Sequence, residues 1–268
     1  MDSKKIVIAS GKGGVGKTTI TANLGRALAE LGKRVALVDV DFGLNNLDVV
    51  LGVENQILYD LQDVLDGKCR VKQALVQDKY KKNLFILPSG RVDSITKING
   101  QNLKLIIDSF INVFDYVLID APAGIELGFH RAISCADEGL VVATPTITSL
   151  RDADKVLSIL RSYKMNKVSL IINRARGDLI LDNKMMLPSD IKLLLKTDLI
   201  GVLPDEDDVF LSAGNKLSKK TDSYKAYKII AENILKGKNN IFDVTTKYSG
   251  FFGSIKRGIK RSLWIKMI

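Results

Sequence analysis

Nine residues near the start of the chain, Gly11-Lys12-Gly13-Gly14-Val15-Gly16-Lys17-Thr18-Thr19, decide the fold that the sequence predicts. They follow an apolar run at residues 5–10 and precede a helical pattern of apolar residues between positions 22 and 31. This order of strand, glycine-rich loop and helix is the context in which the pattern G-x-x-x-x-G-K-[ST] binds phosphate. Glycines let backbone N–H groups close around a phosphate at a helix N-terminus, where the helix dipole favours anions. We therefore expect all nine residues to bind ATP.

Three side chains of this loop have separate expected roles. We expect the Lys17 ammonium to reach the β- and γ-phosphates as a catalytic cation, and the Thr18 hydroxyl to ligate Mg²⁺. Lys12 is a second cation that cannot easily reach the phosphates already neutralised by Lys17. The residues alone leave two interpretations of Lys12, a solvated loop charge and a cation that acts on a neighbouring subunit's nucleotide.

Short apolar runs alternate with helical stretches along the rest of the chain. They lie at residues 5–10, 35–39, 84–87, 116–120, 140–143, 168–172 and 199–203. Strands that alternate with helices predict an α/β fold with a mostly parallel sheet. Several runs are continuously apolar, which is typical of strands covered on both faces. The predicted fold is therefore a P-loop NTPase sheet with helices on both faces and ligands beyond the carboxyl ends of its strands.

Carboxylates follow two of these strands at the positions where Mg²⁺ and the γ-phosphate are expected. Asp39 and Asp41 follow the apolar residues 35–38 of the second run, and Asp120 ends the fourth. A free aspartate has a pKa near ~3.9 and is a poor base, so we expect Asp41 to orient the attacking water and to contact the metal. We expect Asp120 to hold Mg²⁺ directly or through water. The alternative is that these aspartates only cap the ends of strands and keep them soluble. Asp39 is given no firm role.

Polar residues after the last two strands are the candidates for adenine recognition. Asn173 follows the run at 168–172, and Pro204 and Asp205 follow the run at 199–203. All three could instead be turn residues. The small residues at 120–124 suit a loop that senses the γ-phosphate.

The end of the chain has a different composition. The net charge is +10, and residues 251–268 include five basic residues and no acidic one. At 100° per residue one arc is apolar and the opposite side is basic, as in helices that lie on a membrane surface. The apolar set is Phe251, Phe252, Ile255, Ile259 and Leu263, and the basic set is Lys256, Arg257, Lys260 and Arg261. We therefore expect an ATPase domain at 1–235, a flexible linker at 236–250 and an amphipathic membrane-targeting helix at 251–268, with docking on its own domain as the alternative.

The residues after Met1 lack the apolar stretch and cleavage site typical of a secretory leader, so we expect none. No apolar run approaches the 18 residues that a membrane span needs. We expect a cytoplasmic protein that is peripheral on the inner face of the cell membrane. Its single histidine, His130, and its two distant cysteines, Cys69 and Cys135, give no spacing typical of a metal site or a disulfide framework.

Several stretches together resemble the MinD family, the ATPases that help to place the bacterial division site. They are residues 10–19, 39–52, 59–61, 120–126 and 151–154, and the likeness runs over nearly the whole chain. The loop alone resembles all deviant Walker A ATPases, in which a signature lysine enters the partner subunit's site. The sequence departs from the family at Asn45, where the family usually has arginine, and it continues past the expected helix end at residues 264–268.

The resemblance implies an ATP-bound homodimer with Mg²⁺ as cofactor, in which Lys12 acts on the partner's nucleotide. It also implies attachment to an anionic membrane, recruitment of a MinC-type division inhibitor and stimulation of ATP hydrolysis by a MinE-type topological factor. By position, Asn45, Glu126 and Asp152 lie where partners bind, and no specific nucleic acid is expected.

Three other functions stay open at this point. A ParA-type DNA-partitioning ATPase would share the loop and bind DNA through a basic surface. A flagellum-placing ATPase would share the terminal amphipathic helix. The third is a nucleotide-binding scaffold without turnover.

Overall fold

The computed structural model describes residues 3–42, 45–90, 99–251, 253–255 and 257–258. Within these ranges the core is one eight-stranded sheet in the order β3-β4-β2-β5-β1-β6-β7-β8. The strands are β1 (Lys4–Ala9), β2 (Val35–Asp39), β3 (Val76–Gln77), β4 (Leu84–Leu87), β5 (Tyr116–Asp120), β6 (Glu138–Ala143), β7 (Lys167–Ala175) and β8 (Asp198–Pro204). All neighbouring pairs are parallel except β3 and β4.

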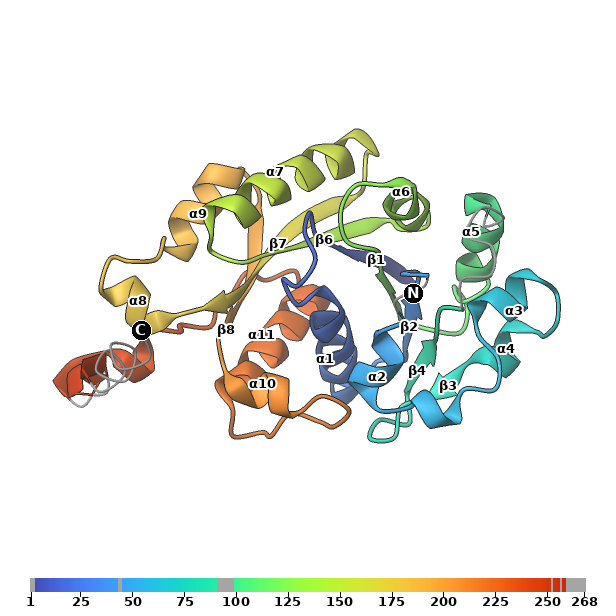
Figure 1. Ribbon diagram of the computed structural model, residues 1–268, viewed down its shortest axis with the longest axis horizontal. Helices are drawn as coiled ribbons and strands as arrows, with labels where there is room; N and C mark the ends of the chain where they lie inside the picture. Colours follow the sequence, from blue (N-terminus) through green and yellow to red (C-terminus); the bar gives the residue numbers. More distant parts are fainter. Residues whose placement is uncertain (1–2, 43–44, 91–98, 252, 256, 259–268) are drawn as a thin grey trace.

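Helices cover both faces of this sheet (Figure 1). One face carries α1 (Lys17–Glu30), α2 (Leu47–Leu51), α10 (Asp207–Leu211) and α11 (Asp222–Lys236). The other carries α5 (Gly100–Asp108), α6 (Leu127–Ile133), α7 (Ile147–Ser162) and α9 (Pro188–Leu195). The short helices α3 (Leu61–Leu65), α4 (Val71–Ala74) and α8 (Gly177–Leu181) lie in connections. The predicted α/β fold class is confirmed.

The central strand β1 explains why continuously apolar runs form this sheet. Successive strand side chains point to opposite faces. Ile6 and Ile8 pack into the core on the α1 and α11 side, and Val7 and Ala9 pack into the core on the α6 and α7 side. β1 pairs with β5 on one edge and β6 on the other. Its carboxyl end therefore lies at the middle of the sheet, where the order of the strands reverses and ligands bind in folds of this kind.

The segment after α11 differs from the flexible linker predicted at 236–250. Val244 and Tyr248 are each only 4% exposed, and Asn240 exchanges hydrogen bonds with Asn233 of α11. The Val244 carbonyl lies so close to Gly177 that a Cβ atom there would be 2.0 Å from it. Isolated apolar side chains therefore fix this segment on the domain although it has no helical or strand periodicity.

After a short 3-10 helix at Thr246–Tyr248, an α-helical segment begins at Gly250, and the described residues of the tail stay helical to position 258. Phe251 and Ile255 are 78% and 48% exposed. Arg257 Nη1 lies 3.4 Å from Asp182 Oδ1, just after α8, so one predicted membrane-binding cation contacts the domain. The other predicted membrane-binding residues lie outside the described part of the chain: Phe252, Lys256, Ile259, Lys260, Arg261 and Leu263. None of the helices in the described ranges has the length and apolarity that crossing a bilayer requires.

Candidate nucleotide-binding site

The glycine-rich loop connects the carboxyl end of β1 to the start of α1. Gly16 caps α1 with φ 93°, a left-handed conformation that disfavours any residue with a Cβ atom. A Cβ atom on Gly16 would also lie 2.4 Å from Asn173 Nδ2. The loop therefore needs glycine here both for its backbone conformation and for close packing on the end of β7.

A buried polar cluster centred on Asp120 lies beneath the loop. Asp120 is 1% exposed, and Lys17 Nζ donates to its Oδ1 atom at 2.8 Å. The Thr18 hydroxyl donates to Oδ2 at 2.7 Å, and the Thr21 hydroxyl donates to Oδ1 at 3.0 Å. The structure thus brings Lys17 and Thr18 of the phosphate-binding loop together with Asp120, which the sequence predicted from a separate strand end.

Asp39 takes a place in this cluster that the sequence did not assign to it. Its Oδ1 accepts from the Asp41 backbone N–H at 2.9 Å and its Oδ2 from the Leu47 N–H at 3.3 Å. It thereby joins the end of β2 to the start of α2. Burial, and then the nearby Asp120 charge, raise the pKa of Asp39 to about 7.

Asp41 lies at the edge of the cluster and is partly exposed. Burial raises the pKa of its carboxyl, the Lys17 charge opposes that rise, and the Asp120 charge adds to it. These charges indicate that Asp41 lies within electrostatic reach of both Lys17 and Asp120. The Val40 backbone N–H, next to Asp41, donates to the Asp120 carbonyl at 3.1 Å. The three predicted metal contacts, Thr18, Asp41 and Asp120, therefore lie near one another.

Mg²⁺ fits this oxygen-rich region only as part of a complex with nucleotide. In the described residues no group of three or more His, Cys, Asp or Glu side chains could hold a metal ion alone. Mg²⁺ is usually held by one or two carboxylates, with phosphate and water oxygens as its remaining ligands. Thr18 and Asp120 can supply the protein's share of such a set.

The predicted adenine contacts surround one cavity of about 240 Å³ beside the loop. Gly16, Thr19, Asn173, Pro204 and Asp205 all line it. Asn173 Nδ2 donates to the Val15 carbonyl at 2.7 Å, which leaves its amide oxygen to accept from a base amino group. This contact suits a base that carries an amino group, and the identity of the base stays a prediction.

The predicted partner-binding residues lie around the same end of the sheet. Asp152 is in the first turns of α7, and a Cβ atom on Gly11 would lie 2.6 Å from its carbonyl oxygen. Glu126 is the exposed N-cap of α6. Asn45 has φ 39° and accepts a hydrogen bond from Ser89. Asp152 is thus in contact with the phosphate-binding loop, and Asn45 is held by a residue that follows β4.

Two residues of the site were missed by the sequence analysis. Thr21 lies one helical turn after Lys17, so the i, i+4 spacing on α1 could have indicated its contact with Asp120. Ser89 contacts Asn45 across 44 sequence positions, and no local pattern in the chain signals that contact.

Comparison with known proteins agrees with this geometry. Residues 6–218 match the model of the CobQ/CobB/MinD/ParA nucleotide-binding domain. The septum site-determining protein MinD of Synechocystis is 47% identical over 207 residues, which are 77% of this chain and 78% of that protein. MinD of Thermotoga maritima is 40% identical over 269 residues, and the match covers 94% of this chain and 98% of that protein. The chain belongs to the MinD family.

Solved structures of MinD-family proteins have the same fold. The MinC:MinD complex of Aquifex aeolicus gives a TM-score of 0.82 at 40% identity, covering 89% of this chain and 97% of that one. MinD of Pyrococcus horikoshii, which was solved with Mg-ADP, gives a TM-score of 0.80 at 30% identity. The match covers 87% of this chain and 96% of that one. MinD-family membership identifies the chain as one of the nucleotide-binding cell-division ATPases.

Proposed function

We propose that this protein is an ATPase that dimerises on binding ATP, attaches reversibly to the membrane and positions the division site by recruiting an inhibitor. The observation that carries the proposal is the buried cluster in which Lys17, Thr18 and Thr21 converge on Asp120 beneath a glycine-rich loop. Family membership adds the cellular role, because the relatives are septum site-determining proteins.

The residues of the cluster suit ATP binding and hydrolysis. Lys17 can exchange its partner Asp120 for the β- and γ-phosphates, which carry more negative charge. Thr18 and Asp120 would hold Mg²⁺, and the bound ion would neutralise part of the phosphate charge. Asp41 then orients the attacking water at the rim of the site, and Asp39 holds the segment that carries Asp41 through its backbone contacts.

The surface around the loop supports dimerisation on this face. Lys12 is exposed at the loop, where its cation is available to a second subunit's phosphate. Ile147 at the start of α7 is 81% exposed, and Leu127 at the start of α6 is 73% exposed. Large apolar side chains beside a charged functional loop are typical of a surface that a partner covers. We assign that partner as a second copy of the chain with ATP bound between the two.

The tail provides the proposed membrane attachment. Burying a large apolar side chain such as Phe251 or Ile255 contributes about 1.5–3 kcal/mol, and each cation near an anionic leaflet about 1 kcal/mol. Ordering the tail costs about 1–2 kcal/mol for each residue that is fixed. A single tail therefore binds weakly, whereas two tails joined in an ATP-bound dimer gain from bivalency. Membrane affinity then depends on nucleotide state without any new lipid contact.

A MinC-type inhibitor and a MinE-type factor are the proposed protein partners. The Aquifex aeolicus relative was solved in a MinC:MinD complex, which supports the first of these. Asp152 offers a physical connection, because its backbone packs on Gly11 of the phosphate-binding loop. A partner that binds at Asp152 would therefore contact a residue whose position depends on the loop.

The test is to capture partners with the ATP-bound protein and to compare its binding to anionic liposomes and to DNA. Capture of a MinC-type inhibitor, with flotation on liposomes and no DNA gel shift, is the expected result. A DNA shift without flotation would indicate a ParA-type function. Capture of flagellar proteins instead would indicate a flagellum-placing ATPase.

A further inference from the structure

A second cavity lies beside the nucleotide site, between α1 and α11. Its volume is about 710 Å³, within the range of about 300–1,000 Å³ that small-molecule sites occupy. Asn23 and Tyr227 line both this cavity and the predicted base cavity, so the two are separated by a shared wall. The α1 helix that forms one side of it begins with the phosphate-binding residues Lys17 and Thr18.

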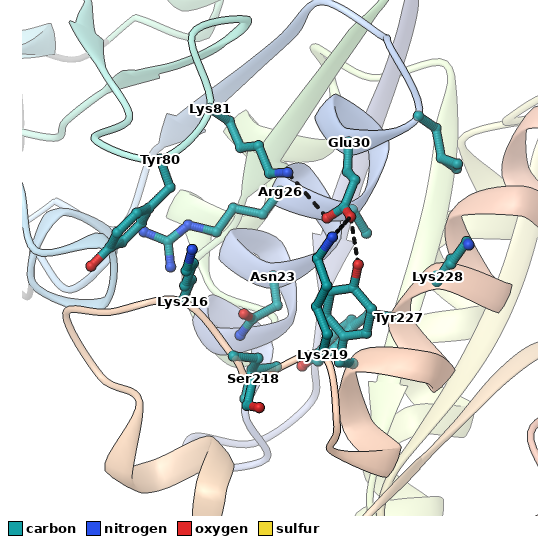
Figure 2. A pocket seen from close by; sticks show the side chains of 14 residues that line it. Asn23, Arg26, Glu30, Tyr80, Lys81, Lys216, Ser218, Lys219, Tyr227 and Lys228 are labelled. Carbon is teal, nitrogen blue, oxygen red and sulfur yellow. Dashed lines mark hydrogen bonds and ion pairs between the residues drawn. The ribbon is translucent and has the colours of Figure 1, made fainter.

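The lining is strongly basic. Five basic residues and one acidic residue, Glu30, line the cavity: Arg26, Lys81, Lys216, Lys219 and Lys228. They come from α1, from the connection between β3 and β4, from the segment before α11 and from α11 itself (Figure 2). A fold that gathers cations from four segments into one hollow raises the local concentration of anions there.

Most of these charges have partners that hold them in place. Arg26 Nε and Nη2 contact Asp78 Oδ1 at 3.0 and 2.8 Å, and the side chain is nearly buried. Glu30 accepts from Tyr224, Lys81 and Lys219. Burial raises the pKa of Glu30, but these hydrogen bonds outweigh burial and lower that pKa to about 2. Glu30 is therefore ionised and already engaged with its own neighbours.

Two cations are left over. In the part of the chain that the structure describes, neither Lys216 nor Lys228 has a carboxylate partner. Lys216 Nζ instead lies 5.4 Å from the centre of the Tyr80 ring, which also stacks with Arg26 at 5.1 Å. Figure 2 shows Tyr80 and Arg26 on one side of Glu30 and Lys228 on the other. The cavity therefore has unpaired positive charge on two sides.

Apart from Asn23 and Ser218, the remaining lining is aromatic or apolar. Tyr80, Tyr224 and Tyr227 contribute rings, and Ala27 and Leu217 contribute apolar surface. A small inorganic anion would contact the cations and leave the aromatic and apolar part of the lining hydrated. A ligand with both a negative group and a planar body would use both parts of the lining.

We propose that this cavity is a second ligand site, distinct from the nucleotide site, for an organic anion with a planar body. An occupant would contact the same helix that carries Lys17 and Thr18. The proposal does not depend on the division-site function, because it follows from the cavity alone.

The test uses anilinonaphthalene sulfonate as the probe and the full-length protein saturated with Mg-ADP, so that the nucleotide site is filled. We expect saturable fluorescence with one site per chain. The double variant Lys216→Gln/Lys228→Gln should weaken binding about tenfold, because two charge contacts of up to about 1 kcal/mol each are lost. The control Lys72→Gln/Lys184→Gln removes the same charge from exposed positions outside the cavity and should bind as the unmodified protein does.

A second variant tests the planar part of the ligand. Tyr80→Leu should weaken probe binding and leave the weak competition by inorganic phosphate unchanged. Equal binding to the unmodified protein and to both cavity variants would overturn the proposal. An equal loss of binding in the control variant would also overturn the proposal, because binding would then depend on net charge. Competition by phosphate as tight as the binding of the probe would overturn it too.

Discussion

Lys17 Nζ lies 2.8 Å from Asp120 Oδ1, and the side chains are 7% and 1% exposed. The contact joins the first turn of α1 to the last residue of β5, 103 positions apart. A buried ion pair is stable only while both partners are present, because an unpaired charge cannot be solvated in the interior. The same contact positions the lysine and the carboxylate that ATP and Mg²⁺ are expected to need.

Lys17→Ala should abolish ATP binding and also weaken the fold. Removing one partner of a buried pair costs about 3–5 kcal/mol, because Asp120 is left buried without a cation. Calorimetry measures the binding, and urea unfolding without nucleotide measures the stability. The control Lys72→Ala, at an exposed position in α4, should change neither. Unchanged ATP affinity in the folded Lys17→Ala protein would refute the assignment.

The raised pKa of Asp39 predicts that the stability of the nucleotide-free protein depends on pH. Its pKa in the folded protein is raised to about 7, so between pH ~4 and ~7 the folded chain binds more protons than the unfolded chain. The free energy of unfolding contributed by this group is therefore present at low pH and lost as pH rises through about 7.

Asp39→Asn should make that part of the slope smaller, because the amide cannot ionise beside Asp120. The measurement is urea unfolding at several pH values in the presence of a chelator. Asp190→Asn, at the exposed start of α9, is the control and should keep the slope. An Asp39→Asn slope equal to that of the unmodified protein would show that another group is responsible.

Lys12→Ala should bind nucleotide as a monomer and fail to dimerise. Its side chain is exposed, and the proposed target is the partner's phosphate, so monomer affinity should stay within about threefold. Sedimentation velocity with a non-hydrolysable ATP analogue measures the dimer. Lys184→Ala, another exposed lysine, should dimerise normally. A Lys12→Ala protein that dimerises and hydrolyses ATP at the normal rate would rule out a role in trans.

Asp41→Ala should bind ATP and hydrolyse it about 100-fold more slowly, because the attacking water loses the group that orients it. The protein should accumulate on anionic liposomes as a long-lived ATP-bound dimer. Phosphate release and the rate of dissociation from liposomes are the two measurements. Rapid dissociation with ATP would mean that hydrolysis does not depend on Asp41.

Local patterns were enough to predict the seven parallel strands and the phosphate-binding loop. The short β3 was not predicted, because a two-residue antiparallel edge strand has no periodicity to detect. From the sequence, Asp41 was expected to contact the metal and the attacking water, whereas Asp39, the last residue of β2, received no firm role. The pairing of Asp39 with Asp120 across β2 and β5 places Asp39 in the buried cluster, and only the sheet register gives that pairing.

Features built from distant segments could not be predicted. The contact of Asn45 with Ser89 and the burial of Val244 and Tyr248 depend on how separate loops pack. The basic cavity gathers lysines from positions 81 to 228, which in the sequence are scattered surface charges. Charge and apolar pattern predict which residues can form a site, whereas tertiary packing decides which of them meet.

The central claim is that ATP-driven dimerisation controls attachment to the membrane through the tail. Sedimentation with anionic liposomes tests it directly, by comparing the full-length protein with a chain that ends at residue 250, each with ATP and with ADP. Two joined tails should bind about 10²–10⁴-fold more tightly than one. We predict that full-length protein pellets with ATP and not with ADP, and that the shortened chain binds ATP but stays in the supernatant. Equal pelleting of both chains with ATP would contradict the claim.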